Sequence, residues 1–216
     1  MAVVALAVFL TGRRSIPASV IEFGQKYPEA SGFVEDYPKY KDQKQDMDIS
    51  GEVEQGTIPL FIQWDRRWGY ERYGSDLLAI TGCGPTCISM VLCGLTGDTA
   101  WNPYEVAKFS EEHGYYVPGE GTSWELMTEG AGLLGLDGAY GEVSSSYIYE
   151  QLGGGCPLIC SMYPGDFTYT GHFIVLTGID ADGRILVNDP NSRINSEKHW
   201  DMEVLLPQIR SVWVYS

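Results

Sequence analysis

Thr81-Gly82-Cys83-Gly84-Pro85-Thr86 begins the most strongly patterned helix of this chain. Pro85 lacks an N–H and has its φ angle already set, so it suits the first turn of a helix. Apolar side chains then recur at helical spacing, at Ile88, Val91, Leu92 and Leu95. This stretch predicts a buried helix with Cys83 at its N-cap or in its first turn, and the domain is expected to be organised around it.

Cys83 lies where a helix presents unpaired N–H groups and the positive end of its dipole. Both features stabilise a thiolate and lower the pKa of the thiol. The flanking Gly82 and Gly84 carry no side chains, so a substrate backbone is expected to approach the sulfur closely. We interpret Cys83 as a nucleophile; the alternative is a structural buried cysteine, the commoner use of this residue type.

Composition limits the partners and ligands of the 216-residue chain. Its 29 acidic residues outnumber 14 basic ones, and no basic stripe is present to neutralise phosphates, which argues against a nucleic-acid partner. The five cysteines show no CxxC spacing and the three histidines are scattered, so no metal site is predicted. No disulfide is assigned, and the redox compartment is left open.

The chain divides into three parts. The apolar run of residues 1–10 precedes Thr11-Gly12-Arg13-Arg14, and it is shorter than the roughly 20 residues of a membrane helix. It also lacks the basic start and cleavage site of a signal peptide. We interpret residues 1–15 as the end of a membrane anchor that begins upstream; the alternative is a frayed or self-buried N-terminus.

Residues 16–56 form an N-terminal arm. Pro17 is expected to open a helix that Pro28 ends, with an apolar face of Val20, Ile21, Phe23 and Tyr27. Residues 35–56 are rich in Asp, Glu, Lys and Gln, which is typical of a linker. The arm is either a removable pro-segment or an uncleaved extension packed on the domain.

Residues 57–216 carry helical patterns first and strand patterns later. After a short strand at 58–62 and a loop, helices are predicted from 83, from 103 to about 113, from 122 to about 135, and from 144 or 145 to 153. Strands follow at 157–162, 172–178, 184–188 and 212–215, with a hairpin turn at Asp182-Gly183 and a short helix or turn at 199–209. Helices followed by antiparallel strands predict an α+β domain.

The hairpin supplies partners for the cysteine. His172 begins one strand and Asp189 follows its antiparallel partner, so both are expected at the same open end. There the carboxylate would bind one imidazole nitrogen and leave the other facing a thiol, which stabilises an imidazolium and thereby a thiolate. The alternatives are a half-buried strand histidine and, for Asp189, a turn-former before Pro190.

Gln63 completes the candidate site. Its side-chain amide and the backbone N–H of Cys83 are expected to donate hydrogen bonds to a developing oxyanion; the alternative is a surface glutamine at a strand end. The segment 114–122 either borders the cleft or is a solvated connection between helices.

Four blocks in this order resemble a known family: Gln63-Trp64-Asp65-x-Arg67-Trp68-Gly69, Gly82-Cys83-Gly84-Pro85-Thr86, Gly171-His172-Phe173-Ile174-Val175-Leu176 and Val187-Asn188-Asp189-Pro190-Asn191-Ser192. The chain is similar to the stand-alone, papain-like cysteine peptidases of family thirty-nine, relatives of the peptidase domain of bacteriocin-exporting ABC transporters. It departs from the transporter domains at the glutamine, which in those domains lies much nearer the cysteine.

The resemblance implies a papain-like fold for residues 57–216 and hydrolysis of a peptide or protein substrate without metal or cofactor. It implies Cys83 as nucleophile, His172 as general base and acid, Asp189 as the group that orients His172, and Gln63 in the oxyanion hole. It also implies a bacterial, extracytoplasmic protein, which would suit membrane attachment through the N-terminus.

Three other functions share these residues. The same thioester chemistry serves an acyl transferase, and a transglutaminase-like or peptidoglycan-cleaving amide hydrolase has the same Cys–His–Asp order. The third is a catalytically idle surface-binding domain. Idle copies usually lose one member of the triad, whereas Cys83, His172 and Asp189 are all present in this chain.

Overall fold

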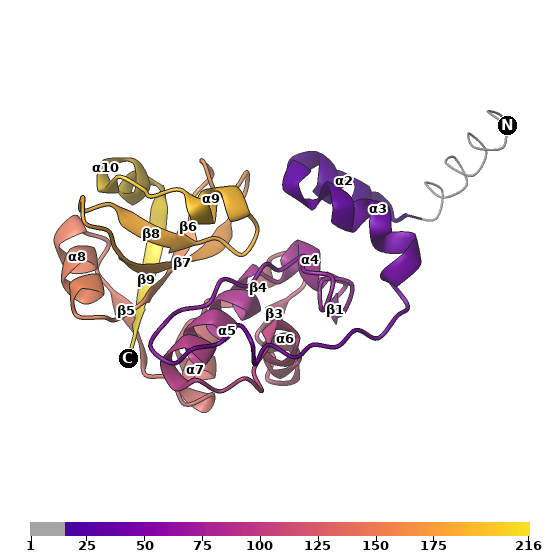
Figure 1. The fold of residues 1–216 in the computed structure, drawn as a ribbon, viewed down its shortest axis with the longest axis horizontal. Coiled ribbons are helices and arrows are strands. Elements are labelled where there is room, and N and C mark those ends of the chain that lie inside the picture. Colours follow the sequence, from indigo (N-terminus) through magenta and orange to yellow (C-terminus); the bar gives the residue numbers. More distant parts are fainter. Residues whose placement is uncertain (1–15) are drawn as a thin grey trace, which may run out of the picture.

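The computed structural model describes residues 16–216, so the membrane anchor expected at residues 1–15 lies outside the described residues. Its centre is a five-stranded antiparallel sheet of order β5-β9-β6-β7-β8 (Figure 1). The strands are β5 (Gly138–Gly141), β6 (Leu158–Met162), β7 (His172–Ile179), β8 (Ile185–Asn188) and β9 (Ile209–Tyr215).

The helices precede the sheet in the chain or lie between its strands. They are α2 (Ala18–Lys26), α3 (Ser31–Tyr40), α4 (Leu78–Thr81), α5 (Cys83–Thr96), α6 (Pro103–Glu112), α7 (Glu129–Leu133), α8 (Ser145–Gly153), α9 (Arg193–Glu197) and α10 (Met202–Leu205). Two small hairpins, β1 (Arg72–Tyr73) with β2 (Asp76–Leu77) and β3 (Tyr116–Val117) with β4 (Gly121–Thr122), lie on the helical side. The α+β prediction is confirmed.

The two faces of the sheet belong to two hydrophobic cores. Side chains such as Ile159, Val175 and Trp213 share one buried cluster with α5. Their neighbours along the strands point the other way, and Leu158 and Ile174 share a second cluster with α8 and α10. This alternation follows from the two-residue repeat of a strand, so α5 shares the core on one face of the sheet, and α8 and α10 share the core on the other.

Helix capping follows the sequence at α6 and again at Ser123, which begins the next helical segment. At α6, Pro103 occupies the first turn and the Asn102 side chain accepts hydrogen bonds from two backbone N–H groups. The segment predicted as one helix from 122 to about 135 is helical but interrupted. The chain forms the 3-10 helix η2 (Trp124–Met127), capped by Ser123, and then α7, because Thr128 between them departs from helical angles (φ −122°, ψ −78°).

The strand predicted at 58–62 is wrong. This segment forms no strand and pairs with no neighbouring strand, and Pro59 has no N–H to give to one. Instead, Nδ2 of Asn188 donates to the carbonyl oxygens of Ile58 (3.1 Å) and Pro59 (2.9 Å). The segment therefore ties the helical side of the molecule to the end of β8.

The N-terminal arm packs as two helices joined by the 3-10 turn η1 (Pro28–Ala30). The helix opened by Pro17 is confirmed as α2, whereas the linker predicted from residue 35 is helical through Tyr40. Phe33 stacks on Tyr70 with ring centroids 4.1 Å apart, and the Tyr70 hydroxyl donates to the Phe33 carbonyl oxygen. Within residues 16–216, none of the helices has the length and apolar character needed to cross a membrane.

Candidate active site

Cys83 is the first residue of α5, and α4 ends just before it. The flanking glycines serve the chain's own packing rather than the approach of a substrate, which corrects the sequence interpretation. A Cβ atom on Gly82 would lie 2.4 Å from the carbonyl oxygen of Leu78, and one on Gly84 would lie 2.7 Å from the side chain of Thr122. Both spaces are occupied, so the glycines let α4 and β4 close tightly around Cys83.

Cys83 is half-buried in a cleft of about 740 Å³ between the two sides of the molecule. One wall comes from α4, α5 and the segment from Tyr116 to Glu125, and the other comes from the sheet, with His172, Phe173 and Arg210. Of the two alternatives for the segment 114–122, the structure supports the first, because its β3–β4 hairpin borders this cleft.

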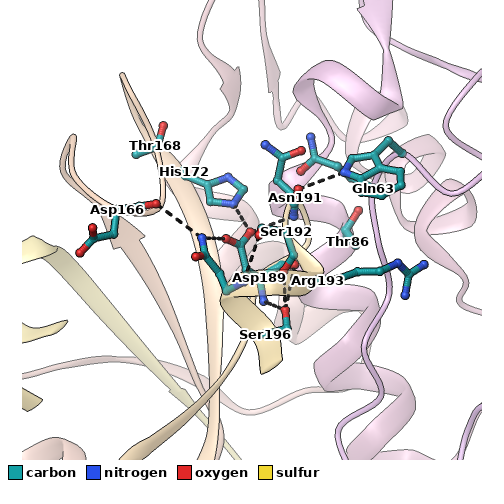
Figure 2. A network of polar contacts seen from close by, with 12 residues as sticks. Gln63, Thr86, Asp166, Thr168, His172, Asp189, Asn191, Ser192, Arg193 and Ser196 are labelled. Carbon is teal, nitrogen blue, oxygen red and sulfur yellow. Dashed lines mark hydrogen bonds and ion pairs between the residues drawn. The ribbon is translucent and has the colours of Figure 1, made fainter. Parts of the chain in front are cut away.

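His172 and Asp189 are in contact at the open end of the hairpin. The distance from Nε2 of His172 to Oδ1 of Asp189 is 2.7 Å, and the pair lies in the network of Figure 2. His172 is 7% exposed and Asp189 is fully buried. The β7–β8 register pairs Val175 with Asn188, which brings the end of β8 back to the start of β7.

The Asp189 carboxylate is held from several sides. Its Oδ1 also accepts the N–H of Asn191 (2.8 Å), and its Oδ2 accepts Nδ2 of Asn195 (2.8 Å). Its own N–H donates to the hydroxyl of Ser196 (2.9 Å). The sequence interpretation missed Asn195 and Ser196, which lie on α9, a short helix that it did not predict.

The pKa values of Cys83 and His172 are shifted in opposite directions. Burial opposes ionisation of Cys83, but hydrogen bonding to His172, the charge of His172 and the backbone N–H groups of Phe173 and Gly84 lower the pKa of the thiol below its usual value. Burial likewise opposes charge on His172, yet the Asp189 carboxylate, with a smaller contribution from Cys83, raises the pKa of the imidazole to about 10. The two directions favour a thiolate–imidazolium pair at neutral pH.

Gln63 is buried, with 2% of its surface exposed, which excludes the alternative of a surface glutamine. Its Nε2 donates to the carbonyl oxygen of Ala79 (2.7 Å) on α4, and its backbone N–H donates to the carbonyl oxygen of Pro190 (2.7 Å). Because a carbonyl oxygen only accepts, this contact fixes which amide atom is nitrogen. The 20-residue separation from Cys83 is taken up by the β1–β2 hairpin and α4, and Gln63 is bound to the helix that leads into Cys83.

The remaining cysteines and histidines are distinct from this site. All five cysteines are free, and burial raises the pKa of Cys87, Cys93 and Cys160. His199 binds Asp180 on the surface. Among residues 16–216, no three His, Cys, Asp or Glu side chains are grouped as a metal ion would require.

Comparison with known proteins identifies a family. The model of the family described as "Peptidase_C39 like family" matches residues 56–216, which include Cys83, His172, Asp189 and Gln63. A search of curated proteins finds no match. Most of the N-terminal arm therefore lies outside the matched region.

Proposed function

Because the chain belongs to the Peptidase C39-like family, we propose that it hydrolyses peptide bonds with Cys83 as nucleophile, His172 as acid and base, and Asp189 as the group that orients His172. Family membership confirms the resemblance drawn from the four blocks and the papain-like fold. It also makes this a domain of cysteine-peptidase type. The observation that supports the reaction best is the 2.7 Å contact of His172 with a buried carboxylate, beside a thiol of lowered pKa.

Acylation begins from the thiolate–imidazolium pair. The Cys83 sulfur attacks the carbonyl carbon of the scissile bond, a C–S bond forms, and the carbonyl π electrons move to oxygen. Nε2 of His172 is engaged by Asp189, so Nδ1 is the ring nitrogen that gives its proton to the leaving amine. The C–N bond breaks, the oxyanion collapses, and a thioester remains on Cys83.

Deacylation uses the same groups in reverse. Neutral His172 takes a proton from water, the hydroxide oxygen attacks the thioester carbon, and the carboxylic product leaves as the C–S bond breaks. The thiolate–imidazolium pair is then restored. Asp189 keeps the imidazole in one orientation throughout.

The proposed oxyanion hole consists of the backbone N–H of Cys83 and the Nε2 amide of Gln63. One amide hydrogen of Gln63 binds Ala79, and Gln63 does not itself line the cleft, so its second amide hydrogen would reach the substrate oxygen only after a movement of the side chain. Oxyanion donors stabilise charge that develops only in the transition state. This arrangement predicts that Gln63 contributes to kcat more than to KM.

The cleft lining supports neutral or basic peptides as substrates. Of the described residues that line it, Asp76, Glu120 and Glu125 bring carboxylates, whereas Arg210 brings the one guanidinium. The guanidinium of Arg210 stacks on the Trp124 ring, 4.9 Å from its centroid. The net charge of −15 on the whole chain acts in the same direction, since it attracts cationic ligands.

Substitution of the nucleophile tests the proposal. A peptide library is incubated with the wild-type protein, with Cys83→Ala and with the matched control Cys156→Ala, which removes a half-buried thiol elsewhere. We expect cleavage by the wild type and the control but none by Cys83→Ala, with unchanged circular dichroism. Cleavage that survives Cys83→Ala would contradict the proposal, and products joined to an added amine would indicate acyl transfer instead of hydrolysis.

A further inference from the structure

The N-terminal arm reaches the active site from outside the cleft. None of its described residues lines the cleft that holds Cys83. The turn after α2 instead borders a smaller cavity of about 250 Å³, whose lining includes Tyr27, Glu29, Thr168 and Asp189. The arm therefore borders this second cavity, on the Asp189 side of the site, and does not line the cleft that holds Cys83.

Glu29 connects the arm to the segment that carries Asp189. Its Oε2 accepts the backbone N–H groups of Arg193 (2.9 Å) and Ile194 (3.2 Å), and its Oε1 accepts the hydroxyl of Ser192. These three residues belong to the stretch 189–196, which runs from the end of β8 into α9; we call it the Asp189 loop. A single carboxylate from the arm thus binds this loop at three successive residues.

The network continues inward from Ser192. Its hydroxyl oxygen accepts the N–H of Asn195 (3.0 Å), and Nδ2 of Asn195 donates to Oδ2 of Asp189 (2.8 Å). Asp189 in turn binds His172. Figure 2 shows Ser192, Asp189 and His172 together in this network, with Asp166 at its edge.

A second arm residue lies against the loop that leads into His172. The ring centroids of Tyr27 and Tyr169 are 6.3 Å apart. Next to Tyr169, the Thr168 hydroxyl donates to the carbonyl oxygen of Gly171, the residue before His172. Two arm residues two positions apart therefore contact the loops that present His172 and Asp189.

We propose that the N-terminal arm is a positioning element of the active site, in which Glu29 holds the Asp189 loop so that Asp189 stays aligned with His172. This inference rests on the proposed function for its consequence in turnover. It distinguishes the two alternatives for the arm: a removable inhibitory pro-segment would raise activity on loss of its contacts, whereas a positioning element lowers it.

The test uses point variants of the full chain. Glu29→Ala removes all three contacts of the carboxylate, Glu29→Gln keeps an oxygen that can accept backbone N–H groups, and Glu35→Ala removes an exposed carboxylate on α3 as the matched control. Each is assayed for kcat and KM on the best peptide from the library. The rate of Cys83 alkylation by iodoacetamide is measured against pH by mass spectrometry, and thermal unfolding is followed in parallel.

For Glu29→Ala we expect kcat to fall about ten-fold with little change in KM, below the roughly 100-fold cost of a 1 Å misplacement. Alkylation of Cys83 should slow at mildly acidic pH, because a poorly aligned Asp189 stabilises less imidazolium and hence less thiolate. Glu29→Gln should keep most of the wild-type kcat and most of the wild-type rate of Cys83 alkylation. Glu35→Ala should match the wild type in both measurements. A general loss of stability would not shift the pH profile of alkylation in a folded sample.

Wild-type kcat and alkylation in Glu29→Ala, or a gain in either, would overturn the inference. If that variant does not fold, Ser192→Ala cuts the network one step further in; a wild-type alkylation profile there would also overturn it. If the wild-type protein cleaves no peptide but its Cys83 alkylates rapidly at mildly acidic pH, the proposed function fails while the alkylation profiles still decide the role of Glu29.

Discussion

Replacement of Asp189 by Asn probes how much of the charge on His172 depends on one buried carboxylate. The pKa of His172 is about 10, against an ordinary value of 6.5. The folded site therefore holds this proton roughly 3,000-fold more tightly than an isolated imidazole, or about 5 kcal/mol. The Asp189 carboxylate is the largest contribution to this increase, ahead of Cys83.

Asparagine removes that charge and also one acceptor. Oδ1 and Oδ2 of Asp189 both accept hydrogen bonds. In asparagine an NH₂ group replaces one of these oxygens, so a donor of the protein would face another donor. We expect kcat/KM at neutral pH to fall about 100- to 1,000-fold. This is less than the roughly 3,000-fold increase in proton affinity, because Cys83 still favours the imidazolium. The pH at which Cys83 begins to alkylate should rise, because its thiolate loses the cationic partner.

The assay combines the pH profile of kcat/KM with the pH profile of iodoacetamide alkylation at Cys83. Asp182→Asn, at the exposed tip of the same hairpin, is the matched control, and circular dichroism reports folding. A folded Asp189→Asn protein with the wild-type alkylation profile would refute the reasoning, because Asp189 would then not be what keeps His172 charged.

Three further predictions concern single residues and pH. Gln63→Ala should lower kcat about 100- to 1,000-fold with a smaller change in KM, as measured by steady-state kinetics, since an oxyanion donor acts in the transition state. Gly82→Ala should destabilise the fold by about 1–3 kcal/mol in denaturant titration, because the new Cβ would lie 2.4 Å from the carbonyl oxygen of Leu78. The lowered pKa of Cys83 should weaken the loss of stability that the raised pKa of His172 causes above pH 6.5, and stability should decline as His172 loses its proton near pH 10.

The sign of that pH dependence follows from two opposing shifts. The raised pKa of His172 contributes stability that is present below pH 6.5 and is lost as pH rises through about 10. The lowered pKa of Cys83 contributes stability that is present above pH 9 and is lost as pH falls through its folded value. Cys83→Ala removes the second effect, so its stability should decline already above pH 6.5; a profile unchanged by this substitution would contradict the coupling.

Controls separate these effects from general damage. Gly132→Ala on α7 adds a Cβ that meets no atom within 4 Å and should not destabilise the protein. For Gln63, a rise in KM alone with kcat unchanged would assign the residue to substrate binding rather than to the oxyanion. Equal stabilities of Gly82→Ala and Gly132→Ala would show that α4 moves freely and that the glycine is not required.

The parts of the molecule that sequence patterns predict are those decided by neighbouring residues. The start of α5 follows from Pro85 and the apolar repeat behind it, and Asn102 with Pro103 begins α6. The meeting of His172 with Asp189 follows from a tight hairpin, because both lie at the ends of paired strands. In each case the contacts that decide the structure span fewer than 20 residues of the chain.

The parts that sequence patterns do not predict depend on contacts across long separations. Glu29 and Ser192 are 163 residues apart. No local sequence pattern indicates that the carboxylate of Glu29 will bind the Asp189 loop. The space beside Gly84 is filled by Thr122, so a glycine that suggests open access to a substrate in fact marks a place where the chain packs against itself. The reacting side chains are thus recognisable from local sequence, whereas the groups that hold them in alignment become visible only once distant segments are folded together.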